Sequence, residues 1–454
     1  MTHEVEGQPA KLDAHMGTWR GRLLGGTVLA AVVGLGAAGA QAALTPGSYR
    51  RFMLAYLVAF AFVLSLALGG LFFVFLQHLT RAGWSVLLRR LPEALAVNIV
   101  VVALLFMPIA ASVLRGQGEI YPWAREAQGH GRTIEQTGPE GTGLKNAETG
   151  WGDAAVNHGE AVDPSYEHQH LDELTLAKRG WLNVPGFVGR WVGYFGLWTL
   201  CGWFYWRNSV RQDDTEDYRR TQTMQRVSGV VAVLFGFTLT FAAWDLLMSL
   251  NPHWYSTIFG VYYFAGAVVG SLSLLILLVL GLKRIGALPA TINTEHQHDL
   301  GKLLFAFVFF WGYIAFSQYM LLWYGNIPEE IFWLRVRGMS TATGSVTEWS
   351  YFAVMMLFGN FLIPFAGLLS RGAKRRAGVL AFWAVWLLVM HWLDLVWLVM
   401  PELGPNVTIG AIEIGLTVGL SSVYLLGVWL TLGRGSLVPV HDPRISESLA
   451  FENV

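Results

Sequence analysis

Four ionisable residues lie within long apolar stretches of the sequence: Asp245, His391, Asp394 and Glu413. A charged side chain is costly inside a bilayer, so an ionisable residue in such a stretch is a functional candidate by default. His391 and Asp394 are spaced i, i+3, which places both on one helix face within reach of each other. A histidine beside a carboxylate can titrate near neutral pH, as a proton relay requires. We therefore interpret the four residues as proton-relay candidates, with helix packing as the alternative role.

Two further groups of polar residues accompany these candidates. The first group, candidate contacts for a quinone or for the relay, consists of Ser317, Gln318, His253 and Trp254. The second group, a candidate proton entry from the cytoplasm, consists of His296, His298 and Asp299. The second group opens an apolar stretch, and acidic residues suit a helix N-terminus electrostatically, so helix capping is its alternative role.

No motif for a ligated redox cofactor is present in the sequence. The single cysteine, Cys201, excludes an internal disulfide, a cysteine-ligated iron–sulfur cluster and a CxxCH haem site. The twelve histidines include no HExxH pattern, and no GxxxxGK[ST] loop occurs. Four histidines lie in a polar stretch that is more typical of a solvated loop than of a metal site: His130, His158, His168 and His170. We expect no metal and no covalently bound cofactor, whereas a bound quinone or menaquinone stays open.

Composition indicates the medium that positions these residues. The chain is 54% hydrophobic and 14% charged, with a mean hydropathy of +0.45. Its apolar residues form blocks, and a membrane-spanning helix needs about 20 such residues. Ten blocks qualify: 22–43, 52–77, 92–114, 186–207, 227–250, 258–282, 302–324, 349–370, 377–400 and 409–432. One such block could be a buried helix of a soluble protein, but ten leave too little polar surface, so we predict an all-α integral membrane protein.

The distribution of Lys and Arg predicts the orientation of this protein. Short loops on one side of the predicted membrane are rich in both residues, and this is the side of the two termini. Both termini are therefore predicted to be cytoplasmic, as tails 1–21 and 434–454. Residues 22–114 and 185–433 then hold the transmembrane helices, and 115–184 form an extracytoplasmic loop. The first apolar block could be a cleaved signal peptide, but its length favours a retained helix. The net charge of zero gives no indication of a nucleic-acid partner.

Four segments resemble the NrfD/polysulfide-reductase-type membrane subunits. They are LQHLTRAGWSVLLRR (76–90), SLNPHWYSTIFGVYYFAG (249–266), HDLGKLLFAFVFFWGYIAFSQYMLLWYGNIPEE (298–330) and HWLDLVWLVMP (391–401). The chain is most similar to the second such subunit of bacterial alternative complex III, a quinol:cytochrome c oxidoreductase. The similarity extends over predicted helices 2 to 10.

This resemblance implies a fold, a location and partners. The fold would be ten helices arranged as two four-helix bundles, formed by helices 2–5 and 6–9, plus two extra helices. The location would be the bacterial inner membrane. The partners would be a sister NrfD-like subunit, a large iron–sulfur subunit and a multihaem c-type cytochrome. The redox centres would lie in those partners, so this chain would have no catalytic centre of its own.

Three functions are open on the sequence. The first is proton translocation in support of quinol oxidation, which the resemblance implies through Asp245, His391, Asp394 and Glu413. The second is a structural membrane anchor that assembles the complex. The third is a secondary transporter, in which broken helices would meet near the midplane. Only Pro108 and Pro364 interrupt the predicted spans in a suitable way, and their positions do not pair clearly.

Overall fold

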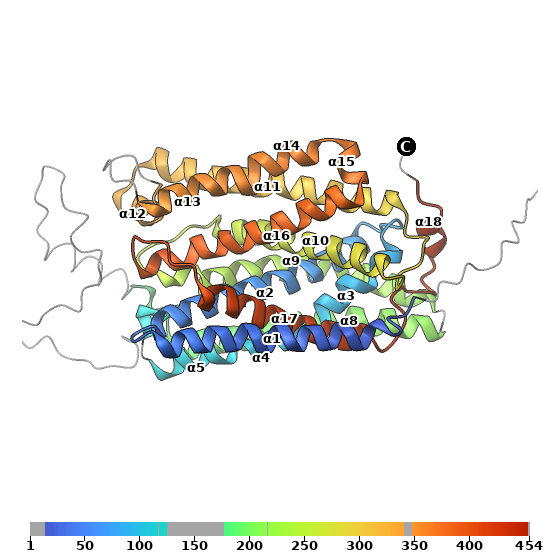
Figure 1. Ribbon diagram of the computed structural model, residues 1–454, viewed down its shortest axis with the longest axis horizontal. Coiled ribbons are helices and arrows are strands. Elements are labelled where there is room, and N and C mark those ends of the chain that lie inside the picture. Colours follow the sequence, from blue (N-terminus) through green and yellow to red (C-terminus); the bar gives the residue numbers. More distant parts are fainter. Residues whose placement is uncertain (1–13, 117, 125–176, 216, 340–346, 453–454) are drawn as a thin grey trace, which may run out of the picture.

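The computed structural model describes residues 14–116, 118–124, 177–215, 217–339 and 347–452, which form an elongated bundle of helices (Figure 1). Nine helical segments in these ranges are long and apolar enough to cross a membrane. They coincide with nine of the ten predicted spans. The prediction of an all-α, multi-pass membrane protein is therefore confirmed for this part of the chain.

The nine segments are continuous helices or short series of helices. Six of them are α1 (Trp19–Leu44), α2 (Tyr49–Leu79), α9 (Tyr218–Leu246, extended by η3, Met248–Leu250), α10 (Phe259–Arg284), α11 (Thr294–Gly325) and α17 (Ala411–Leu432). The other three are α3–α5 (Arg90–Val97, Ile99–Leu105, Met107–Arg115), α13–η4–α14 (Glu348–Met356, Leu357–Leu362, Ile363–Leu369) and α16 (Ala377–Val399, extended by η5, Met400–Leu403). Shorter helices are η1 (Val86–Leu88), η2 (Lys178–Gly180), α12 (Pro328–Val336), α15 (Arg371–Arg375) and α18 (Ile445–Leu449).

The remaining predicted span, 186–207, lies within α8 (Val184–Thr215). This helix is 32 residues long, but its apolar half contains Arg190 and several glycine, tryptophan and tyrosine residues of low hydropathy, so it is less apolar than the nine others. It packs against α3 and α9 within the bundle. The length of α8 suffices for a crossing, and its crossing stays a prediction.

The described helices can be followed as two packing groups, and the two four-helix bundles that the resemblance implies stay a prediction. In the first group α2, α3–α5, α8 and α9 contact one another, and in the second group α10 contacts α11 and α16 while α11 contacts α14. The groups meet where α2 packs against α10, and both helices are buried on nearly all sides. α1 packs on α17, which in turn contacts α2.

One glycine decides how closely the two groups approach. A Cβ atom at Gly69 of α2 would lie 2.3 Å from the Cβ atom of Ser271 and 2.7 Å from the carbonyl oxygen of Ala267, both on α10. Such contacts are far inside van der Waals range, so only glycine permits this crossing. At this point the backbone of α2 at Gly69 therefore packs directly against the side chain of Ser271 on α10.

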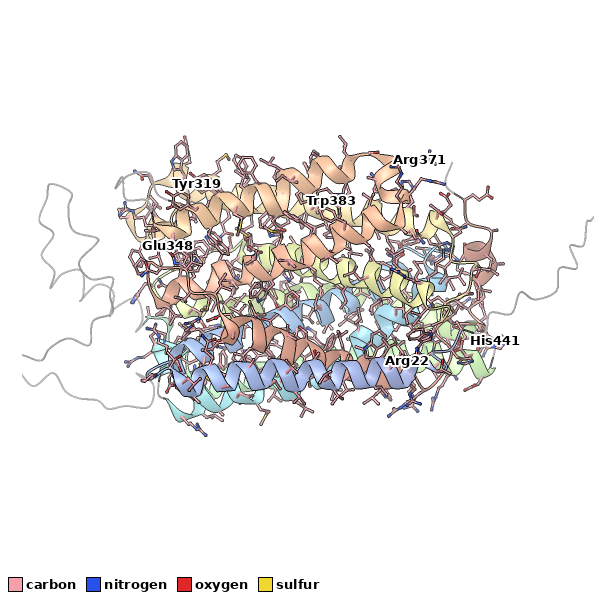
Figure 2. The ribbon with its side chains drawn as sticks, viewed as in Figure 1. Arg22, Tyr319, Glu348, Arg371, Trp383 and His441 are labelled. Carbon is pink, nitrogen blue, oxygen red and sulfur yellow. The ribbon has the colours of Figure 1, made fainter. Side chains whose placement is uncertain are left out.

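The two ends of the bundle are distinguished by the helices that they hold. One end, here called the tail end, holds the start of α1, α15 and α18, and Arg22, Arg371 and His441 lie there (Figures 1 and 2). The opposite end, here called the α12 end, holds α12 and Glu348 at the start of α13. The helices alternate in direction between these ends. The tail end thus corresponds to the predicted cytoplasmic side, and the orientation itself stays a prediction.

Most of the predicted loop 115–184 falls outside the described residues, and so do His130, His158, His168 and His170. Its two described flanks pack on the α12 end of the first group. The Tyr121 hydroxyl donates a hydrogen bond of 2.9 Å to the carbonyl oxygen of Leu246. The Lys178 ammonium donates one of 2.5 Å to the carbonyl oxygen of Pro252. The ends of this loop are therefore anchored on the region where α9 ends.

Two spans are interrupted at prolines. α5 begins at Met107, next to Pro108, after a break in the third span. In the eighth span the six residues Leu357–Leu362 form a π-helix immediately before Pro364. Proline has no backbone N–H and clashes with the preceding turn, so the helix ladder changes register there. The two interruptions lie in different packing groups.

Candidate functional site

Asp394 of α16 is a buried carboxyl held by uncharged donors. Its side chain is in the middle of the second group, and the residue is 2% exposed. The Tyr262 hydroxyl of α10 donates a short hydrogen bond to Oδ1. The Trp311 indole of α11 donates one of 3.3 Å to Oδ2. Three helices therefore converge on this carboxyl, and no guanidinium or ammonium group of the described residues forms an ion pair with it.

His391, one turn earlier on α16, hydrogen-bonds across to the first group. Its Nε2 atom lies 2.7 Å from the Ser65 hydroxyl of α2. That hydroxyl donates its hydrogen to the carbonyl oxygen of Phe62 at 2.6 Å. Nε2 must then carry the imidazole hydrogen, which leaves Nδ1 as the basic nitrogen. Nδ1 is buried and has no hydrogen-bond partner among the described residues, so it is available to accept a proton.

Two glycines of α10 make room for this pair. A Cβ atom at Gly270 would lie 2.6 Å from Cδ2 of His391. One at Gly266 would lie 3.1 Å from Nδ1 of His391 and 3.6 Å from Oδ2 of Asp394. Both side chains therefore face the same glycine-lined strip of α10. The predicted shared face is present, although the hydrogen bonds of both residues go to other helices.

Asp245, in contrast, belongs to an ion pair. Arg190 of α8 donates two hydrogen bonds of 2.8 Å, one to each carboxylate oxygen of Asp245. The Trp181 indole adds a third at 2.8 Å, and the Tyr194 hydroxyl adds a fourth at 3.1 Å. A bidentate, fully hydrogen-bonded carboxylate is strongly held in its ionised form. Its contacts match the alternative of helix packing, here between α8 and α9.

Glu413 has an equally complete set of partners. Arg51 at the start of α2 donates hydrogen bonds of 2.7 and 2.9 Å to its two oxygens. The backbone N–H of Gly410 donates a third of 2.8 Å and so caps α17. The Arg51–Glu413 ion pair connects the start of α17 to the start of α2. The four relay candidates therefore divide among three helix contacts, and only His391 and Asp394 share a site.

The predicted cytoplasmic group is part of a helix cap. His296 Nδ1 lies 2.8 Å from Asn293 Oδ1 at the start of α11, and its Nε2 lies 3.2 Å from the Ser448 hydroxyl of α18. Asp299 forms an ion pair with Lys302. His298 is buried beside them. These residues lie at the tail end, where their contacts match the capping role.

The predicted quinone contacts lie near the α12 end. Gln318 is buried on α11, and Ser317 is half-buried. Trp254 stacks on Trp333 of α12 with ring centroids 4.3 Å apart. Trp254 also lines a cavity of about 220 Å³, and His253 is its chain neighbour. The other lining residues are Lys178, Trp181, Leu182, Trp244, Met248, Ser249, Asn251, Pro252 and Tyr255.

Two of the tryptophans that line this cavity have N–H groups that the protein does not use. The indole N–H groups of Trp244 and Trp254 are buried and have no hydrogen-bond partner among the described residues. The Lys178 ammonium lies 5.3 Å from the ring centroid of Tyr255 in the same wall, and burial lowers the pKa of Lys178. Aromatic walls with free N–H donors fit a flat ligand that carries acceptor oxygens.

A buried arginine connects this cavity to the second group. The guanidinium of Arg337, just after α12, lies 3.9 Å from the ring centroid of Trp333. It donates a hydrogen bond of 2.7 Å to the carbonyl oxygen of Leu398 and one of 3.2 Å to the carboxylate of Glu402. Burial lowers the pKa of Arg337 to about 10, against the opposing effect of Glu402. Arg337 thus ties α12 to the end of α16, five residues beyond Asp394.

Sequence reasoning missed the cationic partners and one further carboxyl. Arg190 and Glu93 lie inside the predicted spans 186–207 and 92–114, so the rule that selected the four candidates also selects them. Arg51 precedes a predicted span by one residue and was counted as a loop charge. Arg337 lies in a loop, where hydropathy carries no signal for burial. Among the described residues no group of three or more His, Cys, Asp or Glu side chains could hold a metal ion.

Comparison of the chain with models of known protein families and with curated proteins gives no match.

Proposed function

We propose that this chain is a membrane subunit of a quinol:cytochrome c oxidoreductase complex of the alternative complex III type, or of one with another electron acceptor. In this proposal Asp394 and His391 carry protons. The chain would lie in a bacterial inner membrane beside a sister NrfD-like subunit, an iron–sulfur subunit and a multihaem cytochrome c. The resemblance of the four segments supports the family, and the contacts of Asp394 support the proton role.

The observation that carries the proton role is the difference between Asp394 and the other buried carboxyls of the α12 end. Asp245 and Glu413 each face an arginine, which holds them ionised. Within the part of the chain that the structure describes, Asp394 faces only the uncharged donors Tyr262 and Trp311. Such donors stabilise the Asp394 carboxylate when it forms. They carry no positive charge, so they disfavour the protonated carboxyl less than an arginine would. A carboxyl in this setting is suited to gaining and losing a proton.

His391 is suited to exchange that proton. Its Nδ1 faces the same strip of α10 as Asp394 Oδ2, within a few ångströms of the Cβ position of Gly266. A rotation of the carboxyl or a single intervening water would connect the two atoms. The proton would then pass between Oδ2 and Nδ1, while Ser65 keeps the imidazole oriented through Nε2. Quinol oxidation elsewhere in the complex would supply the electrons and protons.

Asp394→Asn in the assembled complex tests the proton role. We expect the variant to assemble, because no buried cation is left unpaired, and to lose proton translocation coupled to quinol oxidation. Assembly is followed by blue-native electrophoresis and proton release by a pH dye in proteoliposomes. Asp214→Asn, on the exposed end of α8, is the control. An assembled Asp394→Asn complex with unchanged activity and proton stoichiometry excludes the role, and failure to assemble favours a structural anchor.

The cavity beside Trp254 supports a second proposal, that this chain contacts the quinone ring. The Trp244 and Trp254 N–H groups would donate to the carbonyl oxygens, and the aromatic walls would pack on the ring. Trp254→Phe keeps the ring and removes the donor, so we expect a raised KM for quinol with kcat little changed. Trp323→Phe is the matched control, because Trp323 is 58% exposed on α11. An unchanged KM in Trp254→Phe excludes this contact.

A further inference from the structure

Glu93 is a buried carboxyl that the proposed mechanism does not use. It lies in the first turn of α3 near the tail end, and it is 0% exposed (Figure 1). Neither of its carboxylate oxygens accepts a hydrogen bond of good geometry from the described residues. The helices α2 and α8 pack against α3 and close this region on both sides. A carboxylate ion without hydrogen bonds is very unfavourable in such a place.

The nearest cation is committed to another carboxyl. Arg90 Nη2 donates a hydrogen bond of 2.7 Å to Asp213 Oδ2 of α8. Arg90 Nε lies 3.7 Å from Glu93 Oε2, which is too far for a hydrogen bond, and Nε itself has no hydrogen-bond partner among the described residues. The second arginine nearby, Arg89, donates a hydrogen bond of 2.8 Å to Asp442. Each guanidinium therefore has its own close carboxylate, and neither of these is Glu93.

The charges around Glu93 do not balance when every group is ionised. Two guanidinium groups, of Arg89 and Arg90, stand against three carboxyls, of Glu93, Asp213 and Asp442. Ser209 of α8 is neutral, and its hydroxyl lies close enough to act on the Glu93 carboxyl as a donor, although without the geometry of a full hydrogen bond. One proton on a carboxyl restores neutrality, and Glu93 is the carboxyl to which neither guanidinium donates a hydrogen bond.

Other charged or titratable groups of this region are His441, which acts on Asp213, and Arg444, which acts on Asp442 and forms an ion pair with Glu447. His78 of α2 lies on the opposite side of Arg89 and Tyr205. It is buried, its ring stacks on Tyr205 of α8 with centroids 5.4 Å apart, and its Nε2 has no hydrogen-bond partner among the described residues. If His78 is neutral, the three carboxyls of Glu93, Asp213 and Asp442 still outnumber the guanidinium groups of Arg89 and Arg90 by one.

We propose that Glu93 is a proton-binding site, which carries its proton at neutral pH and exchanges it at the tail end. Asp213, whose side chain is 16% exposed, lies on the other side of Arg90 and connects the region to the surface. When Arg90 moves from Asp213 toward Glu93, Glu93 releases its proton and Asp213 can receive one. The further step, in which this proton passes on to Asp394, rests on the proposed function.

Infrared difference spectroscopy of the whole complex tests the proposal. We expect a carbonyl band of a protonated carboxylic acid at neutral pH that shifts in D2O and disappears in Glu93→Gln. Glu413→Gln is the matched control: Glu413 is an equally buried glutamate, but Arg51 holds it as a carboxylate, so its replacement should leave the carbonyl band in place. If Glu93→Gln fails to assemble, Glu93→Asp should move the band instead of removing it.

Two results overturn the proposal: a wild-type complex without such a band, and a band that survives unchanged in both Glu93 variants. The readout is independent of turnover, so the two proposals fail separately. A band that Glu93→Gln removes, together with unchanged proton release in Asp394→Asn, supports the Glu93 site and excludes the relay at Asp394.

Discussion

Asp245→Asn should destabilise the protein far more than Asp394→Asn, although both residues are buried aspartates in apolar helices. Asp245 accepts two hydrogen bonds of 2.8 Å from Arg190 and two more from Trp181 and Tyr194. The substitution keeps the size of the side chain, removes the charge and turns one acceptor into a donor. Arg190 would then be left largely buried, without its counter-ion.

The structure sets the size of this difference. Removing one partner of a buried ion pair costs about 3–5 kcal/mol, because the other charge stays desolvated. Among the described residues Asp394 has two donors, both neutral, and an asparagine oxygen can keep one of them. Losing the other hydrogen bond costs about 0.5–1.5 kcal/mol. We therefore expect Asp245→Asn to lose about 3 kcal/mol more stability than Asp394→Asn.

Thermal and denaturant unfolding of the purified protein in detergent measures both losses. Arg190→Gln combined with Asp245→Asn completes a double-mutant cycle, and the double variant should lose much less than the sum of the two single variants. If Asp245→Asn is no more destabilising than Asp394→Asn, or if the cycle is additive, Asp245 does not act as an ionised anchor. The distinction between anchoring and proton-carrying carboxyls would then fail.

Two further predictions concern the site and the tail end. Gly270→Ala should displace the ring of His391, since the new Cβ atom would lie 2.6 Å from it, and should lower proton translocation; Gly281→Ala on the same helix has open space and serves as the control. Hydrogen bonds from Arg444 lower the pKa of Glu447 below 4.5. This pair therefore stabilises α18 at neutral pH and stops doing so as the pH falls through that lowered pKa, which hydrogen exchange of the C-terminal segment at pH 6 and pH 3 would detect.

Hydropathy predicted the helices well because it is a property of one segment at a time. A stretch of about 20 apolar residues has to be helical in a bilayer, whatever its neighbours are. Nine spans follow from this rule, and they coincide with predicted blocks. α8 is the weaker case, since Arg190 and residues of low hydropathy lie within its apolar half.

The same rule selects ionisable residues but does not assign their partners. It treated Asp245, Glu413 and Asp394 alike, although the first two face Arg190 and Arg51. Which side chain meets which depends on the rotation of each helix and on its neighbours, and both are set by contacts between distant segments. Gly270 shows this dependence, because it permits the position of His391 and lies 121 residues away in the chain.

The sequence by itself determined that this chain is a bundle of membrane helices and that carboxyls and imidazoles lie at depths where burial is costly. Only the tertiary structure decided which of these groups are neutralised by arginine and which are not. The physical reason is that insertion depends on the summed transfer free energy of a segment, whereas the charge state of a buried carboxyl depends on the few atoms within hydrogen-bond distance. Asp394 and Glu93 are distinguished from Asp245 by those few atoms.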